Sequence, residues 1–234
     1  GYVVVALPPA HAAAVEAGRA AARAFFSLPS AAKEALRTPS HSGYTTPYPG
    51  AHECFEVKRW GGEPSYRLPP SPAGTAAALD GLYGALDDCS RRVLAALERG
   101  LHPGAPGYLA SLLDDARRPG AWRSHTATRL LHYDRVHMSP PESLQPHLGA
   151  HTDSSLLTVS PAATCAGLEG VPYRAGGGGT WVGLEDGLGP SEALVFVGDA
   201  LARATLNFYP ALLHRPAVAR MAAAAGGGPA RRST

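Results

Sequence analysis

Two histidines and one aspartate have the residue types and the spacing of a metal site. His151 and Asp153 are separated by one residue just before an apolar stretch, Leu156–Val159, and a third candidate, His214, ends a later apolar segment. Side chains two apart on a strand share one face, so an imidazole and a carboxylate could face one ion. Two imidazoles and one carboxylate on one face of an octahedron leave three positions open, which is typical of non-haem Fe(II) sites that react with O₂.

The His-x-Asp triplet alone is open to a second interpretation. An Asp at the start of a segment often hydrogen-bonds local backbone in a capped turn, and the triplet does not separate the two cases. His147 and His151 also have the spacing of helical zinc motifs, but Gly149 lies between them and no Glu completes a His-Glu-x-x-His pattern. A helical zinc site is therefore disfavoured.

The bulk composition places the chain among ordinary globular proteins. Hydrophobic residues make up 45% and charged residues 17% of the 234 residues, which is far from the composition of disordered chains. The 21 basic and 19 acidic residues give a formal net charge of +2. This balance provides no electrostatic footprint for nucleic acid or anionic lipid, so we expect a small-molecule partner.

The three cysteines favour a reducing compartment. Cys54, Cys89 and Cys165 are far apart and include no C-x-x-C pair, which argues against a disulfide framework and a zinc knuckle. No run approaches the roughly 18 apolar residues of a membrane-spanning helix, so we expect an intracellular, cytoplasmic protein without a membrane segment. Because the chain starts directly on strand-like residues 1–7, we expect a fragment, which leaves an organelle open.

Helices are expected in the first half of the chain. An Ala-rich segment over about residues 10–28 carries apolar residues at near-helical spacing and ends at Pro29. Between residues 75 and 101, apolar residues recur at intervals of three and four, the period of one buried helix face. The Pro/Gly/Ser-rich residues 38–50 predict a loop.

Short strands are expected in the second half, and residues 1–7 predict a buried strand. Apolar or alternating segments separated by Gly/Pro turns cover residues 126–133, 151–160, 193–197 and 205–214. Helices followed by many short strands predict an α+β fold in which N-terminal helices brace a jelly roll, the double-stranded β-helix. We expect an N-terminal helical region over residues 1–118 and the jelly-roll domain over residues 119–234.

Ordered landmarks run along nearly the whole chain. They are residues 25–33 (FFSLPSAAK), Gly43-Tyr44, residues 53–56 (ECFE), residues 149–158 (GAHTDSSLLT), Gly167–Glu169, Trp181-Val182, residues 194–201 (LVFVGDAL) and His214-Arg215. In sequence and order they resemble the plant-type 2-oxoglutarate/Fe(II)-dependent dioxygenases related to isopenicillin N synthase. The resemblance implies that the jelly roll is the catalytic domain and that it is incomplete at its C-terminus.

The same resemblance implies an enzyme with no catalytic residue beyond the metal ligands. With Fe(II) on His151, Asp153 and His214, it would use O₂ and 2-oxoglutarate to hydroxylate or desaturate a small organic substrate, releasing succinate and CO₂. Two alternatives stay open. One is a 2-oxoglutarate-independent Fe(II) oxidase of the same superfamily, for which the substrate or ascorbate would supply electrons. The other is a non-catalytic metal-binding jelly roll, because fold alone implies no function.

The resemblance also implies a site for the co-substrate. In the family an Arg-x-Ser motif holds the distal carboxylate of 2-oxoglutarate, and Arg231 and Ser233 match it. A planar bidentate guanidinium suits a carboxylate, although a basic chain terminus is the alternative for these residues. Tyr133 stands where a phenol would bond the same co-substrate, or it is a half-buried core tyrosine. The organic substrate and the oligomeric state are not predicted.

Overall fold

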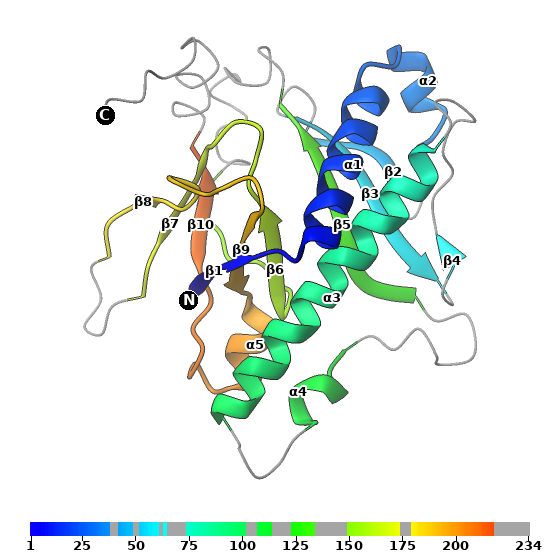
Figure 1. Cartoon of the computed structure of the whole chain (residues 1–234). Helices are drawn as coiled ribbons and strands as arrows, with labels where there is room; N and C mark the ends of the chain where they lie inside the picture. The colour runs from blue at the N-terminus through cyan, green and yellow to red at the C-terminus, as the bar shows by residue number, and fades with distance from the viewer. Residues whose placement is uncertain are drawn as a thin grey trace. The chain divides into compact units, whose positions relative to one another are not determined.

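The described part of the chain forms two compact units. A computed structural model describes residues 1–37, 42–48, 52–60, 63–64, 74–101, 107–113, 123–133, 149–173 and 179–217. The first unit is Leu7–His132, and the second combines Gly1–Ala6 with Tyr133–Thr234. Both contain helices and antiparallel strands (Figure 1), so the α+β class is confirmed. The boundary expected at residue 118 lies outside the described residues.

Two long helices, α1 and α3, belong to the first unit. α1 spans Pro9–Phe26 and α3 spans Thr75–Leu101, which confirms both helices predicted from apolar spacing. Pro9 suits the start of α1, because a helix provides no partner for the N–H that proline lacks there. Two short helices, α2 (Ser30–Glu34) and α4 (Tyr108–Ser111), are also described in this unit.

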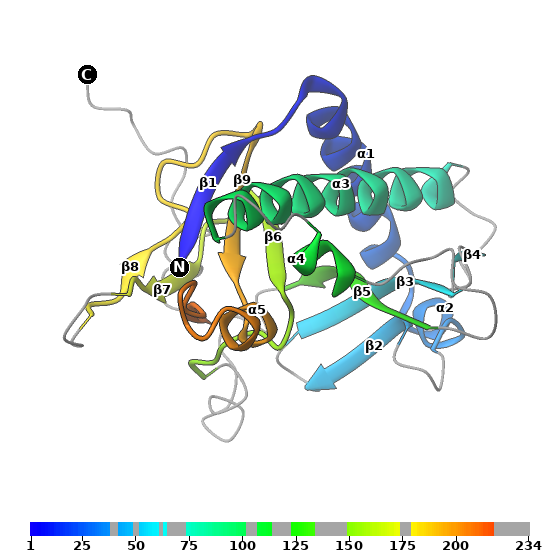
Figure 2. The same cartoon turned by 90° about the horizontal axis from the view of Figure 1, so that it is seen from below.

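The sheet of the first unit is built around β3, His52–Trp60. It pairs antiparallel with β2 (Gly43–Tyr48), β4 (Glu63–Pro64) and β5 (Arg123–His132), and Figure 2 shows β2, β3 and β5 together. The loop expected over residues 38–50 is wrong at β2. Turn-forming residues dominate that segment, but Tyr44 and Thr45 fit a pleated strand and β3 satisfies their backbone groups.

The core of the first unit lies between the two long helices and this sheet. Its buried members are Ala21, Phe25 and Phe26 of α1, Leu79 and Tyr83 of α3, and Tyr44, Phe55 and Val57 of the sheet. The Phe25 and Phe55 ring centroids lie 4.5 Å apart. Burying each large apolar side chain contributes about 1.5–3 kcal/mol, so this face explains why both helices form where the spacing predicted them.

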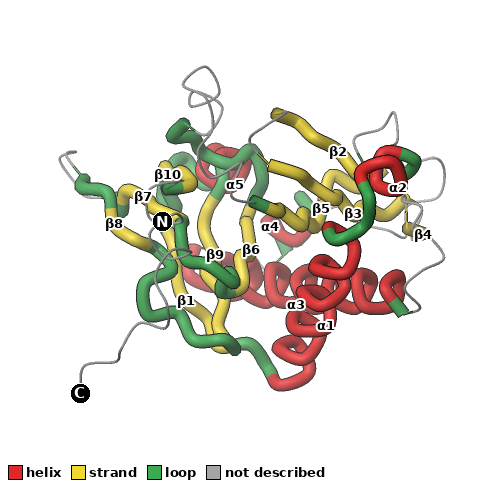
Figure 3. Tube along the Cα trace, turned by 90° about the horizontal axis from the view of Figure 1, so that it is seen from above, coloured by secondary structure: helices red, strands yellow, loops and turns green. Residues whose placement is uncertain are grey.

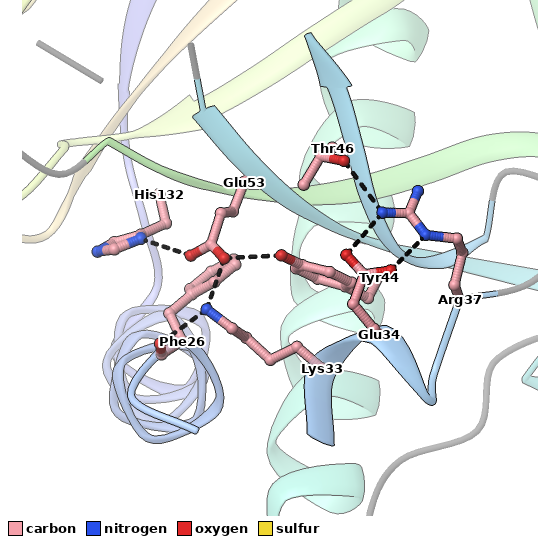
Figure 4. Close-up of polar contacts among 8 residues, drawn as sticks. All are labelled: Phe26, Lys33, Glu34, Arg37, Tyr44, Thr46, Glu53 and His132. Atoms are coloured by element: carbon pink, nitrogen blue, oxygen red, sulfur yellow. Dashed lines mark hydrogen bonds and ion pairs between the residues drawn. The ribbon is translucent and has the colours of Figure 1, made fainter. Parts of the chain in front are cut away.

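A partly buried polar cluster joins four elements of the same unit. Lys33 Nζ on α2 and Tyr44 OH on β2 donate to Glu53 Oε1 at 2.5 and 2.7 Å. His132 Nδ1 on β5 lies 3.1 Å from Glu53 Oε2 (Figure 4). The His132 ring stacks on the Phe26 ring, with 4.9 Å between the two ring centroids. Lys33 is 5% exposed, and a charge so buried needs a partner. We call Lys33, Tyr44, Glu53 and His132 the Glu53 cluster.

The described residues of the second unit form two antiparallel sheets of three strands each. The first has the order β1-β9-β6 and the second β10-β7-β8 (Figure 3). Their strands are β1 (Tyr2–Ala6), β6 (Leu157–Pro161), β7 (Leu168–Val171), β8 (Val182–Gly183), β9 (Glu192–Val197) and β10 (Leu213–Pro216). A short helix, α5 (Asp199–Ala204), follows β9. The strands predicted at residues 1–7 and 193–197 are confirmed.

Two other predicted strands are wrong over much of their length. The strand expected over residues 151–160 starts only at Leu157, because the residues before it form a turn held by α5. The strand expected over residues 205–214 is mostly a turn, in which Leu206 and Asn207 have φ of 50° and 61°. Apolar content alone does not separate a strand from such turns.

β1 differs from expectation in its burial. Tyr2, Val3 and Val4 are 41%, 46% and 42% exposed, so the prediction of a buried strand is wrong. Among the described strands, β1 pairs with β9 and lies at the edge of its sheet. An edge strand can be apolar without being covered on every side. None of the helices described is both long and apolar enough to cross a membrane.

Candidate metal centre

Pairing between distant segments brings His151 and His214 together. The two residues form an isolated antiparallel bridge, in which each backbone N–H donates to the carbonyl of the other residue at 2.9 Å. Residues directly opposed on antiparallel chains carry neighbouring side chains on one face. The two ring centroids accordingly lie 4.4 Å apart.

Backbone carbonyls fix which nitrogen of each ring is free. His151 Nδ1 lies 3.0 Å from the carbonyl of Gly149, and His214 Nδ1 lies 3.1 Å from the carbonyl of Leu212. A carbonyl oxygen only accepts, so in the neutral rings the proton is on Nδ1 and each Nε2 keeps a lone pair. Metal-binding histidines typically have their second nitrogen held in this way.

Asp153 reaches the two rings from a turn. Its Oδ1 lies 3.8 Å from His151 Nε2 and 3.7 Å from His214 Nε2, and one ligand atom from each residue falls within 4.8 Å of the others. The structure therefore brings together the three residues that the sequence singled out. The reason given for their meeting was wrong, because Asp153 precedes the first residue of β6 and does not share a strand face with His151.

The two imidazoles differ in their surroundings. The side chain of His214 is 6% exposed and that of His151 is 52% exposed. Burial lowers the pKa of His214, and the hydrogen bond to Leu212 with the nearby charge of Asp153 only partly offsets this effect. A lowered pKa favours the neutral imidazole, which is the form that binds metals.

The start of α5 holds the turn that carries Asp153. The N–H of Asp199 donates to the Asp153 carbonyl at 2.7 Å, and the N–H of Ala200 donates to the Ser155 carbonyl at 3.2 Å. A Cβ at Gly198 would lie 2.2 Å from the Ser155 carbonyl oxygen and 2.8 Å from that of Asp153. Only glycine allows this approach, so residues 198–200 of the LVFVGDAL landmark support the candidate ligand directly.

A second set of contacts fixes β10 next to His214. Arg215 Nε and Nη2 donate to Glu169 Oε2 at 3.2 and 3.1 Å. The guanidinium carbon also lies 4.0 Å from the centroid of the Trp181 ring. Glu169 is paired with Arg215 in the register of β7 and β10. The landmarks around Glu169 and Trp181 therefore anchor the strand that carries His214.

The predicted co-substrate residues are placed only in part. Tyr133 directly follows β5 and is half-buried, whereas Arg231 and Ser233 lie outside the described residues. One contact was not foreseen: the Thr158 hydroxyl donates to Asp153 Oδ2. Thr158 was visible as a landmark residue, but an irregular turn separates it from Asp153, so no periodicity could have indicated their contact.

The donor set fits a divalent first-row metal with open positions. Two imidazole nitrogens and one carboxylate oxygen are the ligands of the facial triad used by non-haem Fe(II) oxygenases. His151, Asp153 and His214 are the cluster of this kind found among the described residues. Their role as iron ligands remains a prediction.

Comparison with known proteins gives matches at the level of structure. No family model and no curated protein matches the sequence. A putative 2OG-Fe(II) oxygenase family protein from Caulobacter crescentus is 23% identical with a TM-score of 0.65, over 92% of this chain and 70% of that chain. A rice dioxygenase for auxin oxidation is 25% identical with a TM-score of 0.63, over 93% of this chain and 68% of that one. The protein JOX2, solved in complex with 2OG, Fe and JA, is 18% identical with a TM-score of 0.66, over 92% and 62%.

These similarities extend over nearly all of this chain. They establish that it has the fold of the 2OG-Fe(II) oxygenases, as the resemblance in sequence predicted.

Proposed function

We propose that this protein is a 2-oxoglutarate-dependent Fe(II) dioxygenase that hydroxylates or desaturates a small organic molecule and releases succinate and CO₂. The observation that carries the proposal is the convergence of His151 Nε2, His214 Nε2 and Asp153 Oδ1. With both imidazole protons on Nδ1, three lone pairs face one another. Such an arrangement is unfavourable until a cation occupies the space between them.

The chain's own residues would hold the reactants. His151, Asp153 and His214 would hold the metal, and three protein ligands of this kind would leave room for 2-oxoglutarate and O₂. The iron, when bound, supplies the redox chemistry of O₂ activation and C–H oxidation. The fold agrees with this use, because JOX2, which shares it, was solved with 2OG, Fe and a small molecule, JA.

Three further residues complete the proposed co-substrate site. Arg231 and Ser233 grip the distal carboxylate of 2-oxoglutarate, where a bidentate guanidinium is stronger than a point charge, and Tyr133 adds a phenol donor. The assignment of Arg231 and Ser233 rests on their match to the Arg-x-Ser pattern, and that of Tyr133 on its place after β5.

We also propose the finer architecture. The sheets β1-β9-β6 and β10-β7-β8 would be the two sheets of a jelly roll. The catalytic domain at residues 119–234 would supply every strand of it except β1, which comes from the start of the chain, and the N-terminal helical region would brace it. Both sheets are antiparallel throughout their described pairs, as a jelly roll requires.

A turnover assay tests the function. Protein loaded with Fe(II) should convert 2-oxoglutarate and O₂ into succinate and CO₂, and the His214→Ala protein should not. O₂ uptake that needs ascorbate and ignores 2-oxoglutarate would instead indicate an oxidase of the same superfamily. Metal binding without O₂ uptake or succinate, across a panel of small organic acids and heterocycles, would contradict the proposal and favour a binding domain.

The co-substrate site is tested with a matched pair of arginine variants. Arg231→Ala should weaken 2-oxoglutarate affinity by about 10- to 100-fold, because a charge-assisted pair contributes roughly 1.5–3 kcal/mol. Arg220 precedes Arg231 in the sequence and is followed by Met221-Ala222, so it does not match the Arg-x-Ser pattern. Arg220→Ala should therefore leave the affinity for 2-oxoglutarate unchanged. Equal effects of the two substitutions on 2-oxoglutarate titrations would overturn the assignment of Arg231.

A further inference from the structure

The two oxygens of the Asp153 carboxylate have different surroundings. Oδ1 lies 3.8 and 3.7 Å from the Nε2 atoms of His151 and His214. Oδ2 accepts a hydrogen bond from the hydroxyl of Thr158, at the start of β6. The side chain is thus held at one oxygen and presents the other to the two imidazoles.

The direction of these hydrogen bonds follows from chemistry. An ionised carboxylate only accepts, so Thr158 must donate its single hydroxyl proton to Asp153 Oδ2. Ser155 Oγ lies 3.1 Å from Thr158 Oγ1. Because the Thr158 proton is already used, Ser155 is the donor in this contact. The two hydroxyls form a chain of hydrogen bonds in which Ser155 orients Thr158 and Thr158 orients the Asp153 carboxylate.

Backbone hydrogen bonds hold both ends of this hydrogen-bond chain in place. The N–H of Asp199 donates to the Asp153 carbonyl at 2.7 Å, and the N–H of Ala200 donates to the Ser155 carbonyl at 3.2 Å. The start of α5 therefore holds the turn that carries Asp153 and Ser155. Thr158 lies in β6, whose partner is β9. Both ends of the Thr158–Asp153 contact therefore rest on ordered backbone, so the carboxylate has little freedom to rotate.

We propose that Thr158 is a positioning residue that makes Asp153 a monodentate ligand. This inference rests on the proposed metal site. By occupying Oδ2, Thr158 keeps the second oxygen away from the ion, so that one carboxylate fills one coordination position. A free carboxylate would rotate or chelate through both oxygens, and it would then misplace Oδ1 or occupy a position that a triad must leave open.

The test measures metal affinity and needs no turnover. Mn(II) is added to the metal-free chain, and the unbound ion is quantified by its electron paramagnetic resonance signal. Thr158→Val, which replaces the hydroxyl with a methyl group, should bind Mn(II) about 10- to 100-fold more weakly than wild type, the range typical for a lost outer partner of a metal ligand. Thr158→Ser keeps the hydroxyl and should restore wild-type affinity.

Two further variants make the result specific. Ser155→Ala should weaken Mn(II) binding less than Thr158→Val, because it removes only the group that orients Thr158. Ser160→Ala removes a hydroxyl two residues further along β6 and should have no effect. If Thr158→Val fails to fold by circular dichroism, the comparison of Ser155→Ala with Ser160→Ala decides.

The outcomes separate this inference from the proposed function. Wild-type affinity in folded Thr158→Val, or equal weakening in Thr158→Val and Thr158→Ser, overturns the positioning role and leaves the metal site intact. A wild-type chain that holds no Mn(II) overturns the metal site, and the inference with it.

Discussion

Two carboxylates of this molecule have opposite surroundings. Glu53, in the first unit, accepts hydrogen bonds from Lys33 and Tyr44 at Oε1 and from His132 at Oε2. Asp153, in the second unit, receives a hydroxyl at Oδ2, while Oδ1 faces two imidazole nitrogens whose protons are on the far side of each ring. The first carboxylate has its charge neutralised by protein groups, and the second faces other lone pairs.

The partners of a buried carboxylate indicate whether its charge stabilises the fold or is available to bind a ligand. A carboxylate that is surrounded by donors has its cost of burial met within the protein. A carboxylate that faces lone pairs gains most from a cation supplied from outside. The Glu53 cluster is therefore a stabilising element, whereas the proposed metal site at Asp153 would be unfavourable until a cation occupies it.

The sharpest test of this contrast is a pair of substitutions read out by metal affinity. Asp153→Ala removes a proposed metal ligand and should reduce Mn(II) binding by more than the roughly 100-fold upper range of an outer-partner loss. Glu53→Gln should leave it unchanged, because its hydrogen bonds run to Lys33, Tyr44 and His132. Metal titration of both variants checks this, and comparable losses would show that the two carboxylates are not separate in function.

In unfolding experiments the order should reverse, and Glu53→Gln should lower the free energy of unfolding more than Asp153→Ala. Glu53→Gln leaves the ammonium of Lys33 buried without its carboxylate, and breaking a buried pair costs about 3–5 kcal/mol in the free energy of unfolding. Urea unfolding of the metal-free protein measures it. The exposed Glu34, which pairs with Arg37 (Figure 4), provides the control, and Glu34→Gln should change the unfolding free energy little. Similar losses of unfolding free energy in Glu53→Gln and Glu34→Gln would contradict the structural role of the Glu53 cluster.

The Glu53 cluster also predicts a pH dependence. Burial alone would raise the pKa of Glu53, but the hydrogen bonds from Lys33, Tyr44 and His132 outweigh it and hold the pKa below its ordinary value of 4.5. The unfolded chain thus binds this proton more readily than the folded one. The resulting stability is present above pH 4.5 and is lost as the pH falls through the lower, folded value.

Urea unfolding from neutral pH down to about pH 3 measures this contribution. Wild type should lose more unfolding free energy over that interval than Glu53→Gln, which has no proton to bind there. Parallel curves for the two proteins would show that the pKa of Glu53 is not lowered by folding.

The smallest expected effect concerns the turn before β10. Leu206 has φ of 50° and is 92% exposed, so its side chain strains the backbone and buries almost nothing. Leu206→Gly should raise the unfolding free energy by about 1 kcal/mol, the usual strain of a left-handed L-residue. Leu206→Ala keeps the β-carbon and should bring no gain. Thermal melts of the two variants would contradict this if alanine stabilised as much as glycine.

The elements that were predicted well are those with strong local signals. The helices at Pro9–Phe26 and Thr75–Leu101 follow from apolar spacing, and the convergence of His151, Asp153 and His214 follows from residue type and ordered landmarks, while their role as iron ligands stays a prediction. β2 was missed because turn-forming residues dominate its segment, although its partner β3 follows directly. The turn around Asp153 was missed because it is held by Asp199 and Ala200, far along the chain. The pairing of β1 with β9 and of β5 with β3 is long-range in the same way, and no local pattern encodes it.

The proposed function requires His151, Asp153 and His214 to hold Fe(II) with room for 2-oxoglutarate. Visible absorption of the anaerobic protein with Fe(II) and 2-oxoglutarate tests it most directly, because a chelated 2-oxo acid on Fe(II) gives a metal-to-ligand charge-transfer band. We predict that this band forms with wild type, needs both additions and is lost in Asp153→Ala. No band in folded, Fe(II)-bound wild type, or an equal band in Asp153→Ala, would contradict the account.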